Sequence, residues 1–223
     1  MKFEIAIISL EDSPRRNYIK VIPEFYINAV NAKHFSLDAL QSKIKFHTGK
    51  EFMSCKGVPI NARWKIKIAI FLSHLKSLRW VIQTRYERSK LVIPPLLILE
   101  DDFKIDYDSP RDIPIPEPPE DWEILFLGGS WSNKKGHIEK PQKGWNLINH
   151  SKINWWTCSG YIVRDPVKLL QNIRSFGYLT SIENYYNKWI YKSMKSYYLY
   201  PSVVTKNDFK VIQVIPSFYM GDD

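Results

Sequence analysis

The sequence predicts an α/β protein, in which short buried strands alternate with helices. Three observations carry this prediction: an apolar run followed by a helix start at residues 3–14, helical periodicity over 61–87, and a second apolar run at 96–99. Strands that alternate with helical segments favour a sheet with helices packed against it.

The first strand is expected over residues 3–10, FEIAIISL, because the run is apolar and rich in β-branched residues. Glu11-Asp12-Ser13-Pro14 follows, which offers an Asp or Ser cap and a proline for the first turn of a helix. A second short strand is expected near 26–30. Residues 34–59 favour irregular structure, with some helical tendency at 36–44.

Residues 61–87 predict a long helix. Apolar residues recur there at three- and four-residue spacing and form one face: Ile68, Phe71, Leu72, Leu75, Leu78 and Ile82. A smaller and more polar stripe beside this face carries Ser73 and His74. After Pro94 and Pro95, the run LLIL has no alternation, which predicts a strand covered on both faces.

The second half of the chain continues the pattern of strands and helices. Five prolines within 109–119 predict an extended surface connection, and 122–127, WEILFL, predicts a buried strand. Residues 130–149 are polar and favour one mobile loop. A strand is expected at 161–163, a short helix at 166–173, and an amphipathic helix at 182–194 that begins at Thr180 or Ser181.

Composition narrows the class of protein. With 223 residues, 44% hydrophobic and 14% aromatic, the chain is too apolar to be disordered, and we expect a single domain over 1–223. No apolar run approaches the roughly 20 residues that span a bilayer, and Glu4 lies where a signal peptide would begin its apolar stretch. We therefore expect a cytoplasmic protein of bacterial or viral origin, and leave a peripheral association with a membrane open.

Charge and cysteine content say less about partners. The net charge of +9 favours anionic partners, among them nucleic acid, acidic membranes and nucleotide phosphates, and it is spread along the chain. The two cysteines, Cys55 and Cys158, are too few for a disulfide framework, so buried thiols and a reducing compartment are expected. The histidines have no paired spacing, which gives a zinc site little support.

The acidic residues Glu100, Asp101 and Asp102 are the most specific candidate site. Three adjacent carboxylates at the end of a buried strand repel one another unless a cation or donors compensate them. Mg²⁺ and Mn²⁺ prefer oxygen ligands, and ligands of open α/β sheets bind beyond the carboxyl ends of strands. The alternative is a solvated turn in which Asp101 or Asp102 caps the next element.

Three other segments carry candidate residues. Arg15 and Arg16 open a helix after the first strand, a place where phosphate binds well, although they can equally be solvated. His74 is able to contact a phosphate or a sugar hydroxyl, or to be bonded within the core. Glu183 is a candidate general base, or the last residue of a Thr180-x-x-Glu183 capping box. Six aromatic residues suit stacking on sugar rings or a place in the core: Trp155, Trp156, Tyr185, Tyr186, Tyr197 and Tyr198.

Several of these segments resemble glycosyltransferase family 25, the lipooligosaccharide and collagen-type galactosyltransferases. The resemblance is carried by IISLEDSPRR (7–16), NAVNA (28–32), IAIFLSHLKSL (68–78) and, most specifically, LLILEDDF (96–103). WEILFLGG (122–129), SGYIV (159–163) and SIENYYNKW (181–189) look like later segments of that family.

The resemblance implies a GT-A-like α/β fold, with a mixed, mostly parallel central sheet flanked by helices. It also implies Mn²⁺ or Mg²⁺, a UDP-sugar donor, and transfer with inversion to a hydroxyl of a glycan or glycoconjugate, as in lipopolysaccharide biosynthesis. By this resemblance Asp102 and Glu100 bind the metal, and Glu183 is the catalytic base. The donor would be bound by the remaining residues of the matching segments: Ser9, Leu10, Arg15, Arg16, Ser73, His74, Glu100 and Asp101.

Our hypothesis from the sequence is therefore a metal-dependent hexosyltransferase that transfers galactose or a related sugar and does not act on nucleic acid. One alternative is a nucleic-acid-binding or nucleotidyl-transferring protein, which the basic charge motivates. Another is an inactive relative that only binds sugars, because Lys65 to Ile70 depart from the family's usual residues ahead of the Leu-Ser-His motif. Neither the oligomeric state nor the sugar follows from the sequence.

Overall fold

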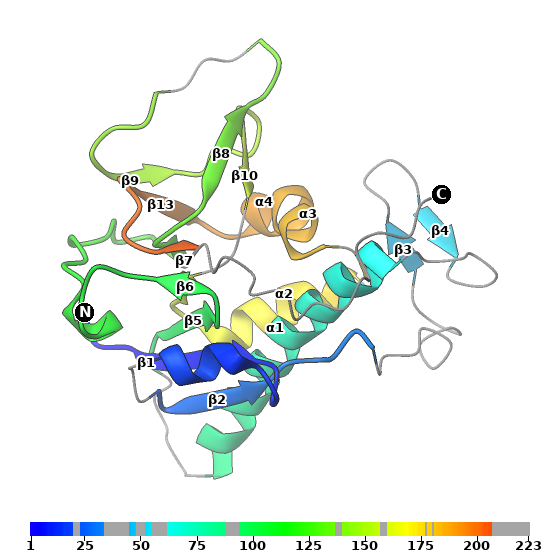
Figure 1. Ribbon diagram of the computed structural model, residues 1–223. Helices are drawn as coiled ribbons and strands as arrows, with labels where there is room; N and C mark the ends of the chain where they lie inside the picture. The colour runs from blue at the N-terminus through cyan, green and yellow to red at the C-terminus, as the bar shows by residue number, and fades with distance from the viewer. Residues whose placement is uncertain are drawn as a thin grey trace.

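The chain folds around one large mixed, mostly parallel sheet with helices packed on it (Figure 1). This computed structural model describes residues 1–19, 23–33, 45–47, 52–54, 62–87, 94–136, 140–156, 160–176, 178–179 and 181–206. The α/β class with a mixed, mostly parallel sheet, predicted from the sequence, is confirmed. The helical tendency expected at 36–44 and both cysteines lie outside the described residues.

The central sheet has 7 strands in the order β2-β1-β5-β11-β7-β13-β9. In chain order they are β1 (Glu4–Ser9), β2 (Phe25–Asn28), β5 (Leu96–Glu100), β7 (Ile124–Phe126), β9 (Gly144–Leu147), β11 (Gly160–Val163) and β13 (Ser196–Tyr200). β1, β2, β5, β7 and β13 run in one direction, and β9 and β11 run in the other. β11 is inserted between β5 and β7 and is antiparallel to both, so it joins two parallel groups into one sheet.

Smaller sheets extend this framework. They are formed by β8 (Ser130–Asn133) with β10 (Ile153–Trp156), by β3 (Lys45–His47) with β4 (Phe52–Ser54) and β12 (Tyr178–Leu179), and by β6 (Phe103–Lys104) with β14 (Thr205–Lys206). The prediction of a single loop over 130–149 was wrong, because β8 and β9 both lie in that stretch. Its polar residues occupy exposed positions of a ribbon and an edge strand.

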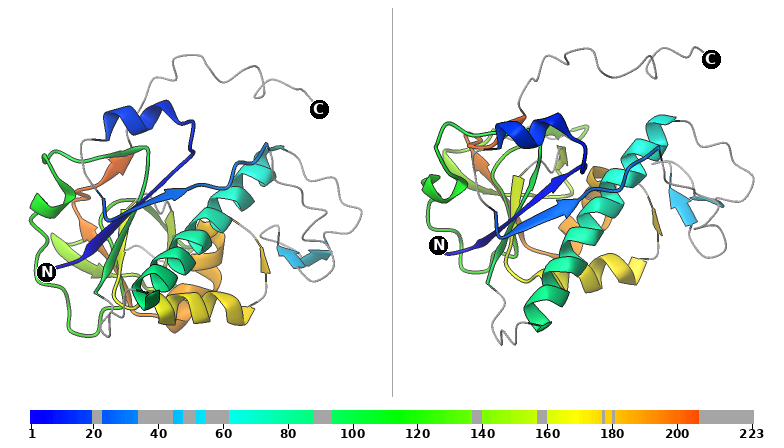
Figure 2. Two further views of the ribbon diagram at one scale, coloured as in Figure 1. Left: turned by 90° about the horizontal axis from the view of Figure 1, so that it is seen from below. Right: turned by 60° about the horizontal axis from the view of Figure 1, so that its bottom comes forward.

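The helices gather mainly on one side of the sheet, as Figure 2 shows for α1, α2 and the α3–α4 segment. The helical elements are η1 (Pro14–Tyr18), α1 (Ala62–Glu87), η3 (Pro110–Asp112), α2 (Pro166–Phe176), α3 (Ile182–Tyr185), the π-helical turn η4 (Tyr186–Ile190) and α4 (Tyr191–Ser193). The helices expected over 61–87, 166–173 and 182–194 are therefore confirmed, and the last of them is interrupted by a π-helical turn.

Both faces of β1 and β5 are buried, as their unbroken apolar runs predicted. Ala6 and Ile8 face the core beneath the helices, whereas Ile5 and Ile7 face a second core on the other side of the sheet. The second core is completed by the proline-rich segment through Ile113 and by residues near the end of the described chain. Because β1 and β5 are packed on both faces, the edge of the sheet at which they end is held in place.

The buried face of α1 includes the predicted apolar face, since Ile68, Phe71 and Leu78 are buried, and it extends beyond that face. The polar stripe is buried, with Ser73 and His74 each 2% exposed and Ser77 0% exposed, while Leu72 and Leu75 are only partly buried. The serine hydroxyls donate to carbonyl oxygens one turn earlier in the same helix, which satisfies them without water. The helix therefore presents polar side chains to the interior of the protein next to the end of β5.

A buried ion pair ties the end of α1 to the start of β1. Arg85 is 1% exposed, and its Nε and Nη2 atoms donate to Glu4 Oε2 at 2.8 Å and 2.6 Å. We expect Glu4→Gln to lower the free energy of unfolding by about 3 kcal/mol, because the guanidinium stays buried without its counter-charge. Urea denaturation would measure this change. Glu11→Gln, at an exposed position, is the control, and equal midpoints for the two variants would contradict the prediction.

Candidate functional site

Three parallel strands end side by side and bring the predicted segments together. Ser9 at the end of β1 is in register with Asn28 at the end of β2, and Ile8 is in register with Glu100 at the end of β5. The backbone N–H of Asp101 continues this ladder by donating to the Ile8 carbonyl oxygen at 3.0 Å. The acidic turn 100–102 therefore lies at the carboxyl edge of the sheet, where open α/β sheets bind ligands.

Asp101 connects the acidic turn to the N-terminal helix. Its Oδ2 atom accepts from Ser9 Oγ at 2.8 Å and from Ser13 Oγ at 2.7 Å, and its Oδ1 atom accepts from Arg15 Nη1 at 3.3 Å. Ser13 is also the N-cap of η1, since its hydroxyl oxygen accepts from the backbone N–H of Arg15. The Asp101 carboxylate thus has three donors from the N-terminal segment and holds that segment against the turn.

The two predicted arginines have different surroundings. Arg16 spans the ends of β1 and β2, because its guanidinium donates to Ser9 and to the side-chain oxygen of Asn28, the latter at 2.6 Å. Arg15 pairs with Asp101, and its side chain is 39% exposed. Of the two arginines, Arg15 is therefore the one that contacts the acidic turn directly. Leu10, also predicted to bind the donor, directly follows β1 and is 36% exposed.

Ser73 links helix α1 to the same edge of the sheet. Its Oγ atom accepts from the backbone N–H of Val30 at 2.8 Å and donates to the carbonyl oxygen of Ala69 at 2.7 Å. The hydroxyl therefore joins α1 to the chain that leaves β2. Ser73 and Ser9, both 2% exposed, are brought to the predicted site, where their hydroxyls make contacts within the protein.

Glu100 points toward the interior and contacts His74. The Nε2 atom of His74 lies 3.2 Å from Glu100 Oε1, and its Nδ1 atom lies 2.8 Å from the hydroxyl of Tyr161 on β11. Tyr186, the first residue of η4, donates to the Tyr161 hydroxyl at 3.4 Å. A chain of polar side chains thus runs from the carboxyl edge into the core, and sequence patterns gave no indication of Tyr161 or Tyr186 in this role.

The carboxylates of the turn are the donors for a candidate cation. Mg²⁺ and Mn²⁺ prefer such oxygen atoms, and Glu100 and Asp102 are the ligands that the sequence indicated. Asp101 holds η1 through three donors. Over the part of the chain that the structure describes, no group of three or more His, Cys, Asp or Glu side chains is placed to hold a metal ion. One or two carboxylates suffice where substrate phosphates and water complete the shell, so the donor set fits a cation that arrives with a diphosphate.

Glu183 lies at the start of α3, and the cap of this helix is Ser181. The Ser181 side chain accepts from the backbone N–H of Asn184 at 3.3 Å, which places Glu183 in the first turn. A capping box centred on Thr180 would begin the helix one residue earlier, and Thr180 lies outside the described residues. Asn187 binds the Glu183 carbonyl oxygen and both backbone polar groups of Trp155, which fastens the start of α3 to β10.

The two tryptophans considered for sugar stacking are separated by the structure. Trp155 is 1% exposed and stacks on Tyr198 with ring centroids 4.7 Å apart, so it belongs to the core. Trp156 is 37% exposed at the end of β10, and its indole N–H donates to Ser132 Oγ at 3.1 Å. Only Trp156 of this pair presents its ring to a ligand.

Residues 203–206, near the end of the described chain, pack against the same edge of the sheet. The backbone N–H groups of Val203 and Val204 donate to the Leu127 carbonyl oxygen, and β14 then pairs with β6, directly after the acidic turn. A Cβ atom at Gly128 would lie 1.7 Å from the Val204 oxygen, so only glycine fits beneath this segment. The acidic turn is therefore flanked by the N-terminal segment on one side and by residues 203–206 on the other.

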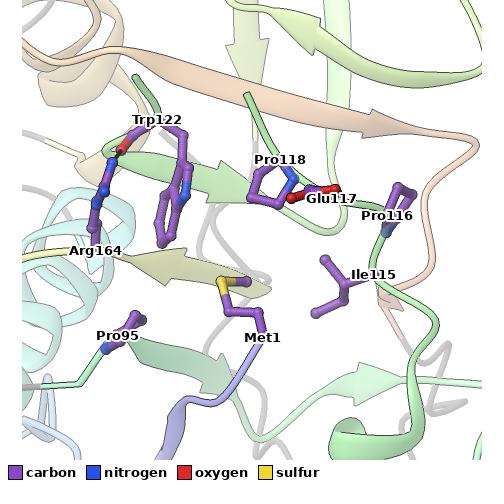
Figure 3. Close-up of a pocket in the computed structure, with 8 residues that line it drawn as sticks. All are labelled: Met1, Pro95, Ile115, Pro116, Glu117, Pro118, Trp122 and Arg164. Atoms are coloured by element: carbon purple, nitrogen blue, oxygen red, sulfur yellow. Dashed lines mark hydrogen bonds between the residues drawn. The ribbon is translucent and has the colours of Figure 1, made fainter. Parts of the chain in front are cut away.

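A pocket of about 530 Å³ lies at the opposite edge of the sheet (Figure 3). It is lined by Met1, Pro95, Ile115, Pro116, Glu117, Pro118, Trp122 and Arg164. The Arg164 guanidinium lies 5.5 Å from the Trp122 ring centroid and donates to the Trp122 and Glu120 carbonyl oxygens. This pocket contains none of the predicted site residues, and its position where β1, β5 and β7 begin is remote from the strand ends that bind ligands in such sheets.

Comparison with known protein families finds no match to this chain, and comparison with curated proteins finds no similar sequence. Among the described helices none is both long and apolar enough to cross a bilayer.

Proposed function

We propose that this protein is a metal-dependent glycosyltransferase that transfers a hexose from a UDP-sugar to a hydroxyl of a glycan or glycoconjugate, with inversion. The observation that carries the proposal is the position of the acidic turn 100–102 at the carboxyl edge of a mostly parallel sheet, next to Arg15. The likeness of LLILEDDF to the acidic motif of glycosyltransferase family 25 supports the same function.

The residues at this edge suit a single displacement. A divalent cation held by Asp102 and Glu100 would neutralise part of the charge on the donor diphosphate. Arg15, whose side chain is 39% exposed, would donate to the departing phosphate oxygens. Glu183, in the first turn of α3, would accept the proton of the attacking hydroxyl.

Two further residues hold the elements of the site in place. Asp101 fixes the turn against η1, and Arg16 fixes the ends of β1 and β2 against each other. These contacts lie within the protein, so we assign Asp101 and Arg16 to positioning the donor site and Arg15 and Asp102 to contacts with the donor and its cation. Trp156 is the exposed aromatic side chain that would stack on an acceptor sugar.

The test is a panel of UDP-sugars incubated with the purified chain, with UDP release as the readout. We expect release with at least one sugar in the presence of Mn²⁺ or Mg²⁺, loss of release with EDTA, and recovery when the cation is restored. Binding of a UDP-sugar without turnover under any metal would favour the inactive, sugar-binding alternative. Absence of both binding and turnover across the panel would refute the proposal.

Arg15 allows a sharper test of the donor contact. We expect Arg15→Ala to lower kcat/KM for the UDP-sugar by about 10-fold to 100-fold, because a charge-assisted hydrogen bond to phosphate contributes about 1.5–3 kcal/mol. Steady-state UDP release measures the effect. Arg111→Ala is the matched control, since Arg111 is also paired with a carboxylate and is 44% exposed, on η3. Equal kinetics for the two variants would remove Arg15 from the donor site.

A further inference from the structure

His74 is buried at the carboxyl edge although its side chain is polar. It is 2% exposed, and both of its ring nitrogens have partners: Glu100 on β5 and Tyr161 on β11. The His74 and Tyr161 rings stack, with an interplanar angle of 18°. An imidazole enclosed in this way lies behind Glu100 and is covered by the core, so it acts through Glu100 and does not touch the donor itself.

The partners determine which ring nitrogen carries the proton. A carboxylate only accepts hydrogen bonds, so the contact at 3.2 Å requires a hydrogen on Nε2 of His74. In a neutral imidazole the other nitrogen is then an acceptor, and Nδ1 receives the hydroxyl hydrogen of Tyr161 at 2.8 Å. The Tyr161 oxygen in turn accepts from the hydroxyl of Tyr186. All donors in this chain of hydrogen bonds point toward Glu100.

We propose that His74 is a positioning residue for Glu100, held as its Nε2–H tautomer by Tyr161 and Tyr186. The Nε2–H group fixes one oxygen of the Glu100 carboxylate and so orients the other toward the cation. The role of Glu100 as a metal ligand rests on the proposed function, whereas the tautomer of His74 rests on geometry alone. Partners behind a metal ligand commonly determine its orientation and its affinity for the metal.

The chain of hydrogen bonds also reaches the helix of the candidate base. Tyr186 begins the π-helical turn η4, and Glu183 lies one turn before it in α3. The Tyr186 ring packs edge-on against Tyr161, with centroids 5.9 Å apart. Tyr161 is therefore the central residue of this chain of hydrogen bonds. It contacts His74, which lies behind Glu100, and Tyr186, which follows the helix that carries Glu183.

Tyr161→Phe tests the inference because it removes the hydroxyl and keeps the ring. The matched control is Tyr185→Phe, which deletes another fully buried hydroxyl, one residue before Tyr186, whose partner is the Ile173 carbonyl oxygen at 2.6 Å. Tyr161→Phe loses its hydrogen bonds with His74 and Tyr186, and Tyr185→Phe loses one hydrogen bond to the backbone. Loss of a buried hydrogen bond elsewhere in the core would not change the tautomer of His74, so that readout is specific to the hydroxyl of Tyr161.

Two readouts apply to the full chain. The first is ¹⁵N NMR of histidine-labelled protein at neutral pH, in which the His74 signal is identified by its loss in His74→Gln. We expect the proton on Nε2 in the unmodified protein and in Tyr185→Phe, and a mixture of tautomers in Tyr161→Phe. The second is Mn²⁺ binding in the presence of UDP, followed by electron paramagnetic resonance, where Tyr161→Phe should weaken Mn²⁺ binding by about 10-fold relative to Tyr185→Phe.

The outcomes separate this inference from the proposed function. If the unmodified chain binds Mn²⁺ and releases UDP but carries the His74 proton on Nδ1, or if Tyr161→Phe matches Tyr185→Phe in both readouts, the positioning role is overturned and the proposed function stands. If the unmodified chain neither binds Mn²⁺ nor releases UDP, the proposed function fails and the role of His74 toward a metal ligand fails with it, whatever its tautomer.

Discussion

Asp102→Asn is expected to reduce Mn²⁺-dependent UDP release by about 10³-fold, because a bound cation contributes several kcal/mol of charge stabilisation in the transition state. Asparagine keeps the shape of the side chain and removes the negative charge that a hard cation requires. The fold should persist, so the urea midpoint is expected to stay close to that of the unmodified chain. The measurement is UDP release at saturating Mn²⁺.

Asp101→Asn is the matched comparison within the same turn, and its expected effect is on stability. The Asp101 carboxylate accepts from Ser9, Ser13 and Arg15, and loss of its charge weakens all three contacts. We expect a loss of about 2 kcal/mol in the free energy of unfolding. If Asp102→Asn retains full activity in a folded protein, the metal assignment is wrong. If Asp101→Asn unfolds at the unmodified midpoint, its contacts do not hold η1 in place.

Gly128→Ala is expected to destabilise the protein by about 3 kcal/mol or more, because the neighbouring atoms cannot move aside to make room for an added methyl group. The new Cβ atom would lie 1.7 Å from the Val204 carbonyl oxygen and 2.6 Å from its carbonyl carbon. Both atoms belong to backbone that is hydrogen-bonded to Leu127, so neither can rotate away as a side chain would. Urea denaturation would report the change as a lower midpoint.

Gly136→Ala is the control for this variant. Gly136 has φ of 85°, and a Cβ atom there would meet no atom within 4 Å. We expect it to cost about 1 kcal/mol from backbone strain alone. A Gly128→Ala protein that is as stable as the Gly136→Ala protein would show that residues 203–204 do not pack tightly on the sheet.

The strands beneath the site were predictable because their burial is uniform. Residues 5–8 and 96–99 are apolar at every position, and a strand covered on both faces is the structure that such a run favours. β8, β9 and β13 were not predicted. Their residues are polar or aromatic on at least one face, so a loop over 130–149 and the absence of any assignment at 196–200 followed from composition alone.

Hydrophobic periodicity predicted the apolar face of α1 and left open whether the polar stripe beside it is buried. It ranks side chains by apolarity, whereas Ser73, His74 and Ser77 are buried because their hydrogen bonds are satisfied inside the protein. The partners of His74 come from β5 and β11. Such a pairing depends on the tertiary structure, and a spacing pattern along one helix contains no information about it.

The roles of the individual residues in the acidic turn also depend on the tertiary structure. The sequence indicates that negative charge is concentrated at 100–102, and the family resemblance assigns all three carboxylates to the metal or the donor. Their different roles depend on the N-terminal segment, because the partners of Asp101 are 86 to 92 residues away along the chain. Only the folded arrangement distinguishes the carboxylate that holds η1 from the two that we propose to bind a cation.

The insertion of β11 between β5 and β7 has a consequence for synthesis on the ribosome. β5 and β7 precede β11 in the chain, yet each pairs with it rather than with the other. A nascent chain that ends before Gly160 therefore holds β2, β1 and β5 as one partial sheet with an open edge at β5, while β7 and β9 lack the strands β11 and β13 with which they pair. Such edges are prone to pair with other chains. Folding of the whole sheet, and with it the appearance of Tyr161 behind the acidic turn, must wait until most of the polypeptide has been translated.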